Sequence, residues 1–159
     1  LHLVVLLILD SGLRISEVLG VSRDDISLEQ STVRVMGKGR RERVVPFSLE
    51  LRKHLFRWMQ HHQHELVFSG RHGSRLTVRY IQRQFKWLQE KLKIHGVRMS
   101  PHTLRHTFAT YYVRSGGGEF RLQRMLGHST LEMTRRYVNL QTEDLQAVHH
   151  QCSVLVKVG

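Results

Sequence analysis

The hydrophobic positions divide the chain into several segments of helical period and one pair of short strands. Residues 1–10, LHLVVLLILD, are apolar on every side, and a helix without a polar face has to be buried. The segments 48–60, 77–95 and 101–112 carry apolar residues three and four positions apart, which predicts helices with one buried face each. The positions expected to face the core are Leu51, Leu55, Trp58, Met59, Ile81, Phe85, Leu88, Leu92, Leu104, Phe108, Tyr111 and Tyr112.

Alternation of apolar and polar residues marks the strands. Residues 32–36 alternate with the period of a half-buried strand, and residues 43–46 return as a second strand after the turn-like sequence GKGR. Lys38 therefore lies at the tip of a predicted hairpin, where a lysine often serves solubility alone. The segment 65–69 predicts one more short strand, and 22–27 a loop. Together the segments predict an α+β protein that is mainly α-helical with a small antiparallel β-sheet.

Capping residues predict where the later helices begin and end. Ser100 followed by Pro101 is typical of a helix start, with serine as the N-cap and proline in the first helical position. Gly127 predicts the end of a helix that begins near residue 120. Ser129 and Glu132 have the spacing of a capping box, so a new helix is expected to begin after Ser129.

Two arginines lie near predicted helix starts. His102 and Arg105 are three residues apart, so they share one face of the first turn of their helix. Because a helix N-terminus already favours anions, this pair predicts a phosphate site. Arg14 and Glu17 have the same spacing on a short helix for which residues 10–12 offer the N-cap. The alternative for Arg14 is a surface arginine paired with Glu17.

Charge is the unusual feature of the composition. The 159 residues include 25 Lys and Arg against 13 Asp and Glu, which gives a formal net charge of +12 before any of the 12 histidines is protonated. A charge of this size and sign indicates a polyanionic partner such as nucleic acid. A basic surface without a function is the alternative, and charge alone does not decide between them.

Composition also limits other kinds of site. Cys152 is the only cysteine, so the chain can form neither an internal disulfide nor a cysteine-based zinc site, which fits a reducing cytosol. His61, His62 and His64 are close enough in sequence for a metal site, but a polar helix end is the preferred interpretation. The apolar segment 1–10 is too short to span a membrane.

The C-terminal third resembles a known family. His102-x-x-Arg105, then Leu-Gly-His128, then Tyr137 nine residues later, resembles the C-terminal signature of the tyrosine recombinases, the phage-integrase family. Each of these motifs alone is only moderately specific. A third glycine before Glu119, where the family often has two glycines and then an acidic residue, is a small departure outside the signature positions.

Two upstream segments extend the resemblance over residues 12 to 140. Arg14 lies in GLRISE and Lys38 in GKGRRER, which are the arginine and lysine segments of the family pattern in the family's order. The resemblance implies a catalytic set around a tyrosine nucleophile. Its members would be Arg14, Lys38, His102, Arg105, His128 and Tyr137.

The chemistry of these side chains suits in-line phosphoryl transfer, which needs a nucleophile, charge stabilisation and a proton for the leaving oxygen. Arg14 and Arg105 are permanently charged, bidentate phosphate ligands. Histidines exchange protons near neutral pH, and Lys38 can protonate a leaving 5′ oxygen. Tyr137 can hold a covalent phosphate. Its alternative is structural, because Met133, Tyr137 and Leu140 also have the spacing of a helical core.

The resemblance further implies the tyrosine recombinase catalytic-domain fold and a reaction without metal or cofactor. One strand of double-stranded DNA would be cleaved through a 3′-phosphotyrosyl link, with a free 5′-hydroxyl, and then joined to a partner strand. The family acts as a tetramer that exchanges C-terminal segments, a role that the apolar tail 152–158 fits. The alternatives are a topoisomerase-like nicking and closing enzyme and a non-enzymatic DNA-binding module.

Residues 1–159 are expected to form one catalytic domain. Because the chain opens at Leu1 without an initiator methionine, we expect a fragment whose N-terminal DNA-clamping domain is missing. The expected location is the cytoplasm, in a bacterial or phage-encoded context, with no contact to a membrane.

Overall fold

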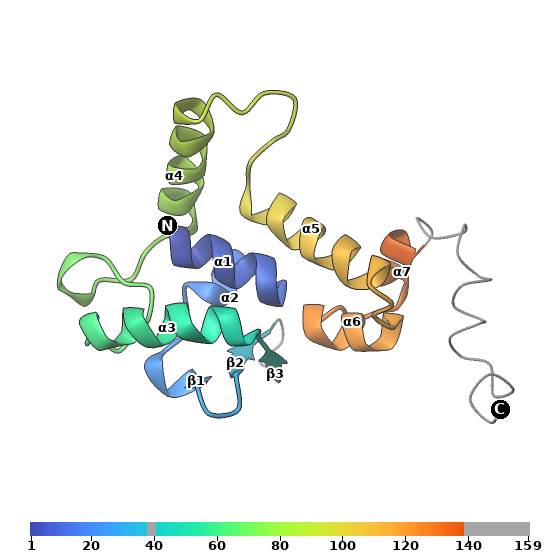
Figure 1. Cartoon of the computed structure of the whole chain (residues 1–159), viewed down its shortest axis with the longest axis horizontal. Coiled ribbons are helices and arrows are strands. Elements are labelled where there is room, and N and C mark those ends of the chain that lie inside the picture. The colour runs from blue at the N-terminus through green and yellow to red at the C-terminus, as the bar shows by residue number, and fades with distance from the viewer. Residues whose placement is uncertain (38–40, 139–159) are drawn as a thin grey trace, which may run out of the picture.

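The computed structural model describes residues 1–37 and 41–138, with only the backbone described at positions 136 and 138. Helices make up most of this part of the chain, and a small sheet lies at one side (Figure 1). In chain order the elements are α1 (His2–Ser11), α2 (Ile15–Val18), η1 (Arg23–Asp25), β1 (Ile26–Ser27), β2 (Thr32–Met36), β3 (Glu42–Pro46), α3 (Leu49–His61), η2 (Arg71–Gly73), α4 (Val78–Lys91), α5 (Pro101–Arg114), α6 (Glu119–Leu126) and α7 (Glu132–Val138).

Helix α1 lies at the centre of the fold, where it packs on α5 and α3 (Figure 1). Leu7 and Ile8 are fully buried, as the apolar sequence of this helix predicts. The helix ends at Gly12, which has the left-handed φ of 67° and whose amide donates to the Ile8 carbonyl. A Cβ atom at Gly12 would lie 2.3 Å from the Phe108 ring, so only glycine lets α1 and α5 approach this closely.

The predicted hairpin is present, and β2 and β3 pair in antiparallel register with Val33 opposite Val45. The sheet has a third strand, β1, in the segment expected to be a loop, and its order is β1-β2-β3. The strand expected at residues 65–69 was wrong, because this segment forms only isolated bridges at Leu66 and Ser69. Two of its three consecutive apolar residues, Val67 and Phe68, are buried, so they fill the core without the alternation of a strand.

The helix starts at Ser48, Thr77 and Ser100 follow the capping rules, since each of these side chains accepts a backbone amide of the first turn. Helix α4 ends earlier than predicted because Lys93 adopts a left-handed φ of 52°. Leu92 is consequently 56% exposed, which contradicts its predicted place in the core.

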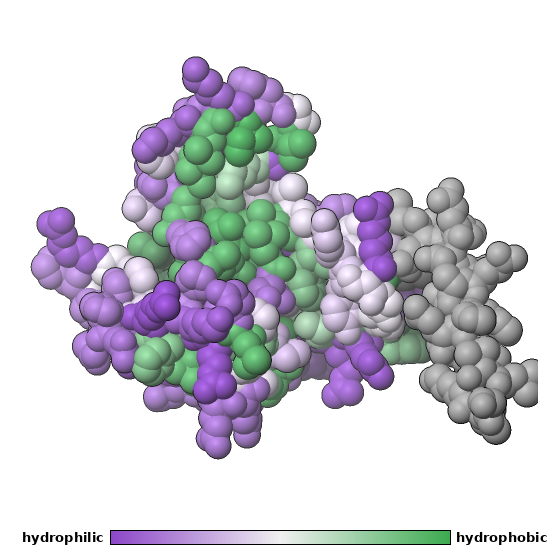
Figure 2. Space-filling view, in the orientation of Figure 1, coloured by the Kyte–Doolittle hydropathy of each residue, from purple (hydrophilic) through white to green (hydrophobic). Residues whose placement is uncertain are grey.

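Buried side chains form two clusters. The larger joins α1, the sheet, α3 and α4. The smaller lies between α5, α6 and α7 and contains Tyr137, but not Tyr111, which is 68% exposed and was wrongly expected in the core. Apolar side chains also reach the surface over α4 and the segment that follows it (Figure 2).

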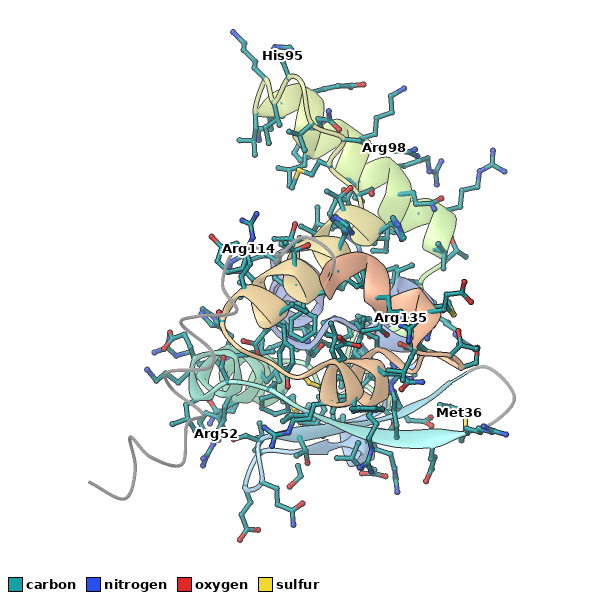
Figure 3. All side chains as sticks on the ribbon, turned by 90° about the vertical axis from the view of Figure 1, so that its right-hand side faces the viewer. Met36, Arg52, His95, Arg98, Arg114 and Arg135 are labelled. Atoms are coloured by element: carbon teal, nitrogen blue, oxygen red, sulfur yellow. The ribbon has the colours of Figure 1, made fainter. Side chains whose placement is uncertain are left out.

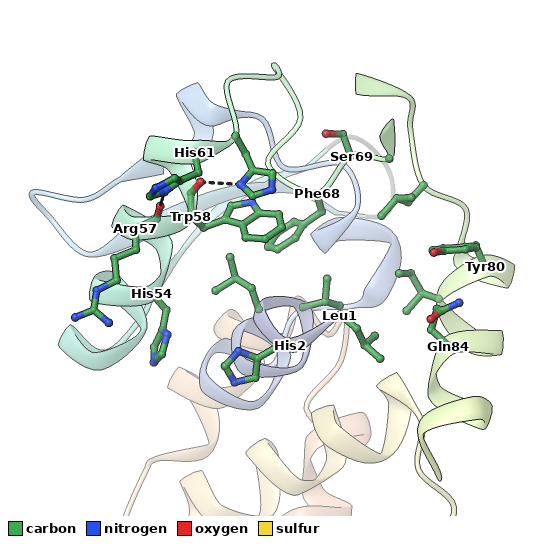
Figure 4. Close-up of a pocket in the computed structure, with 16 residues that line it drawn as sticks. Leu1, His2, His54, Arg57, Trp58, His61, Phe68, Ser69, Tyr80 and Gln84 are labelled. Carbon is green, nitrogen blue, oxygen red and sulfur yellow. Dashed lines mark hydrogen bonds between the residues drawn. The ribbon is translucent and has the colours of Figure 1, made fainter. Parts of the chain in front are cut away.

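A cavity of about 520 Å³ lies between the start of α1, the C-terminal half of α3 and α4 (Figure 4). None of the candidate site residues that the structure describes lines it.

The histidines near the end of α3 have structural roles. The Nδ1 atoms of His61 and His62 donate to the carbonyls of Arg57 and Trp58, so these histidines cap the end of α3. Over the described ranges, no group of three or more potential ligands is placed to hold a metal ion. Among the helices of the same ranges, none is both long enough and apolar enough to cross a membrane.

Candidate active site

Three of the predicted site residues meet where the end of α6 approaches α2 and α5. Arg14 is the N-cap of α2, so the expected cap from residues 10–12 was wrong. Arg105 is buried in α5, and His128 is buried just after α6. In Figure 3, helices α5, α6 and α7 are grouped above the edge of the sheet, and α6 contacts β3 there.

The end of α6 organises the two arginines. The Leu126 carbonyl accepts from Arg14 Nη1 at 3.1 Å and from Arg105 Nη2 at 2.9 Å. Arg105 Nη1 also donates to the Gly12 carbonyl at 2.7 Å, and Arg14 Nη2 to the Gly127 carbonyl at 3.4 Å. The last carbonyls of a helix lack intrahelical partners. Gly127, with a φ of 62°, therefore ends α6 as predicted and leaves oxygens that fix both guanidiniums.

His128 connects this pair to the last helix. Its Nε2 lies 3.1 Å from Arg105 Nη2, and its Nδ1 lies 3.0 Å from Thr134 Oγ1 in α7. Its backbone is held from the other side, since its amide donates to the Gln123 carbonyl of α6 at 3.1 Å. His128 therefore joins the arginines to the helix that carries the predicted nucleophile.

Two further residues of the site were not predicted. Glu17 accepts from both terminal nitrogens of Arg43, and its carboxylate also accepts from the side chain and backbone amide of Arg14. Arg43 extends the network to α6 by donating from Nε to the Met125 carbonyl at 2.9 Å. Glu17 was visible in the sequence as a partner of Arg14, but nothing in the sequence indicated Arg43.

Electrostatics favour an anion at this cluster. Burial alone would raise the pKa of Glu17, but hydrogen bonds and charge from Arg43 and Arg14 lower it below its ordinary value. Burial, together with the charges of Arg14 and Arg43, lowers the pKa of Arg105 to about 10, against opposing effects of Glu17 and Tyr137. The carboxylate of Glu17 therefore only partly balances the three guanidiniums of this cluster.

Tyr137 lies in α7 and is 2% exposed, with its ring 5.2 Å from that of His106. Helix α7 begins at Glu132 rather than directly after Ser129, because the amides of residues 134 and 135 donate to the Leu131 carbonyl. Ser129 instead directs its hydroxyl at the Met133 sulfur, so the expected capping box was wrong.

The remaining two candidates are less closely tied to the cluster. His102 is exposed in the first turn of α5, whereas the buried Arg105 side chain extends toward α6. The phosphate site predicted from this pair therefore stays a prediction, with His102 at the surface and Arg105 in the cluster. Lys38 lies outside the described residues. The ends of its turn are paired, since the Gly37 amide donates to the Arg41 carbonyl at 2.9 Å.

Comparison with known sequences gives a consistent result. A family model described as the phage integrase family matches residues 1–144. The tyrosine recombinase XerC of Chlamydia muridarum is 34% identical over 148 residues, covering 89% of this chain and 47% of the relative. The tyrosine recombinase XerD of Proteus mirabilis is 36% identical over 148 residues, covering 88% and 47%. The chain thus spans about half the length of the curated relatives it matches.

Solved structures share the fold. A crystal structure of the XerA recombinase aligns with a TM-score of 0.79 at 28% identity, covering 94% of this chain and 57% of that one. The XerH recombinase bound to its difH substrate in a pre-cleavage complex gives 0.73 at 26%, covering 86% and 42%. The catalytic domain of bacteriophage HP1 integrase gives 0.69 at 24%, covering 99% and 84%, and supports the fold alone. The predicted catalytic-domain fold, mainly helical with a small antiparallel sheet, is confirmed.

Proposed function

The chain belongs to the phage integrase family, and on that basis we propose that it is the catalytic domain of a site-specific DNA recombinase. It cleaves one strand of double-stranded DNA and joins the freed end to a partner strand. The observation that carries this proposal is the convergence of Arg14 and Arg105 on the Leu126 carbonyl beside His128. That arrangement fixes two bidentate phosphate ligands and one proton-exchanging group in a single positively charged site.

In the proposed reaction, the Tyr137 hydroxyl oxygen attacks a backbone phosphorus. The new bond is a 3′-phosphotyrosyl link, and the bond to the 5′ oxygen breaks. Arg14 and Arg105 stabilise the charge on the non-bridging oxygens. His102 and His128 donate to those oxygens, and one of the two accepts the proton that the Tyr137 hydroxyl loses. Lys38 supplies the proton of the leaving 5′-hydroxyl. No metal or cofactor takes part, because side chains provide each of these functions.

The position of Tyr137 adds one requirement. Its side chain is 2% exposed, so the hydroxyl cannot meet a DNA phosphate in the arrangement described here. Helix α7 covers seven residues up to the end of the described range and follows a short connection from α6. We infer that this helix shifts when DNA binds and so brings the hydroxyl to the phosphate.

The partners follow from the same proposal. The net charge of +12 suits double-stranded DNA, and the structurally similar XerH site-specific recombinase is bound to its difH substrate. We propose assembly into a tetramer on DNA through exchange of C-terminal segments, which lie outside the described residues. Residues 1–159 act as the catalytic domain, and a separate DNA-binding domain belongs to the whole protein. We further propose a location in the cytoplasm of a bacterial or phage-infected cell, for DNA integration or other movement of a mobile element, which the single cysteine and the proposed DNA substrate support.

The test is covalent capture on a suicide substrate, a nicked duplex from which the cleaved fragment diffuses away. Wild type is expected to give a protein–DNA adduct on a denaturing gel, with or without EDTA, and Tyr137→Phe none. Tyr111→Phe is the matched control, since this exposed tyrosine of α5 should leave the adduct unchanged. An adduct that persists in Tyr137→Phe, or one that needs added Mg²⁺, would refute the proposed chemistry.

The burial of Tyr137 would also suit a non-enzymatic DNA-binding module, in which this tyrosine is only part of the core, but the similarity to tyrosine recombinases does not favour that alternative. Such a module would bind DNA and give no adduct with any substrate. A topoisomerase-like enzyme would give the adduct and relax supercoiled plasmid without joining strands of two different duplexes.

A further inference from the structure

The hydroxyl of Thr134 is completely buried and lies 3.0 Å from His128 Nδ1. Thr134 belongs to the first turn of α7, three residues before Tyr137, and so lies on the same side of that helix. This contact joins the helix of the proposed nucleophile directly to a histidine of the phosphate site. Neither the capping pattern nor the family signature pointed to this threonine.

Two contacts of the imidazole indicate which ring nitrogen of the neutral form carries the hydrogen. A guanidinium can only donate, so His128 Nε2, 3.1 Å from Arg105 Nη2, has to accept. The neutral ring then carries its hydrogen on Nδ1. The hydroxyl of Thr134 can accept, and therefore receives that hydrogen. The structure thus assigns the Nδ1–H tautomer to His128, with its Nε2 lone pair directed into the arginine cluster.

We propose that Thr134 is a positioning residue that holds His128 in this tautomer and orientation, and does so only while α7 is docked against α5 and α6. The backbone of His128 is fixed by α6, but its ring is fixed on the Nδ1 side by α7. A shift of α7 that brings Tyr137 to the DNA therefore also changes the contact that sets the proton on His128. The catalytic consequence rests on the proposed function, whereas the tautomer does not.

The tautomer can be measured without DNA. We would label the histidines with ¹⁵N, record long-range ¹H–¹⁵N spectra of the neutral rings, and assign His128 by its loss in His128→Asn. Wild type and Thr134→Ser, which keeps the hydroxyl, should show a protonated Nδ1 and an unprotonated Nε2. Thr134→Val, which keeps the shape but not the acceptor, should show a substantial population of the Nε2–H form. Thr110→Val is the matched control, because the buried hydroxyl of Thr110 in α5 has no partner among the described residues. An unchanged His128 spectrum in Thr134→Val would overturn the proposal.

A double-mutant cycle tests the consequence for cleavage. Thr134→Val should slow adduct formation by about 10- to 100-fold, and Thr134→Ser should restore most of it. In a His128→Asn background, Thr134→Val should slow adduct formation little further, because the effect of the substitution acts through the imidazole of His128. An equal loss in both backgrounds would show a structural role in α7 and refute the coupling. If wild type forms no adduct, the proposed function fails, while the spectra still decide the tautomer.

Discussion

Arg43 and Glu17 face each other in a double hydrogen bond, with Nη1 2.9 Å from one carboxylate oxygen and Nη2 2.8 Å from the other. Because Arg43 Nε also donates to the Met125 carbonyl, one side chain of β3 holds α2 and α6 together. Arg14 is the N-cap of α2, and His128 follows the end of α6. The geometry of the phosphate site therefore depends on an ion pair that does not itself need to touch DNA.

Glu17→Gln should destabilise the domain by about 3 kcal/mol, because it removes a buried carboxylate and leaves the half-buried guanidinium of Arg43 without its ion-pair partner. Urea unfolding of the variant and of wild type measures this difference. Glu50→Gln is the matched control, since Glu50 pairs with Lys53 in full solvent and its loss should have no measurable effect. Equal stability of Glu17→Gln and wild type would show that the ion pair contributes nothing net.

The same carboxylate predicts a pH dependence. Glu17 has a lowered pKa in the fold, so its contribution to stability is complete above its ordinary value of 4.5 and is lost as pH falls through the lowered value. Wild type should therefore lose more stability than Glu17→Gln as the pH falls from 4.5 through the lowered pKa of Glu17. Unfolding midpoints measured from pH 7 down to pH 3 test this, and parallel curves for the two proteins would contradict it.

Gly127→Ala should destabilise the domain and weaken cleavage. A non-glycine residue at a left-handed φ costs about 1 kcal/mol, and here the new Cβ would also lie 2.9 Å from the Arg43 guanidinium carbon. Gly116→Ala separates the two effects, because Gly116 has a φ of 82° but no atom within 4 Å of the Cβ position. Thermal unfolding should show the larger loss for Gly127→Ala, and equal losses would mean that Arg43 adapts without cost.

The sequence predicted local features better than contacts between distant segments. Gly127 could be recognised because a helix end requires a left-handed residue, and Ser100 because a serine side chain caps the following amides. Arg43 could not be recognised, since its partner Glu17 lies 26 residues away on another element. Thr134 was missed for the same reason, because its importance comes from a fold-dependent contact with His128.

Predictions of the fold were also wrong where contacts between distant segments override the local pattern of apolar and polar residues. Residues 65–69 have strand-like composition, but no neighbouring strand is present to pair with them over the described sequence. Leu92 continues the helical pattern of α4 beyond Lys91, yet the backbone turns at Lys93 and leaves it exposed. Periodicity predicted most of the buried positions but not the exposure of Tyr111, and it gave the helix lengths only roughly.

Lys38 provides the sharpest chemical prediction. If the lysine is the general acid, its removal should not slow cleavage of a modified substrate, whereas if it is a phosphate ligand, its removal should slow that cleavage too. The residue lies outside the described part of the chain, so the prediction comes from its place in the GKGRRER turn and the family pattern. Lys38→Ala should change stability by no more than about 0.5 kcal/mol, as for other hairpin-tip positions. If Lys38 protonates the leaving 5′ oxygen, cleavage should slow by roughly 10²- to 10⁴-fold.

A DNA substrate with sulfur in place of the bridging 5′ oxygen separates the two roles. A thiolate leaves without a proton, so the defect of Lys38→Ala should largely disappear on this substrate. Arg105→Ala should remain slow on both substrates, because the guanidinium stabilises the non-bridging oxygens and not the leaving group. The measurement is the single-turnover rate of adduct formation for each of the two variants on each of the two substrates, relative to wild type. If Lys38→Ala is equally impaired on oxygen and sulfur, the lysine binds the phosphate, and another group delivers the proton.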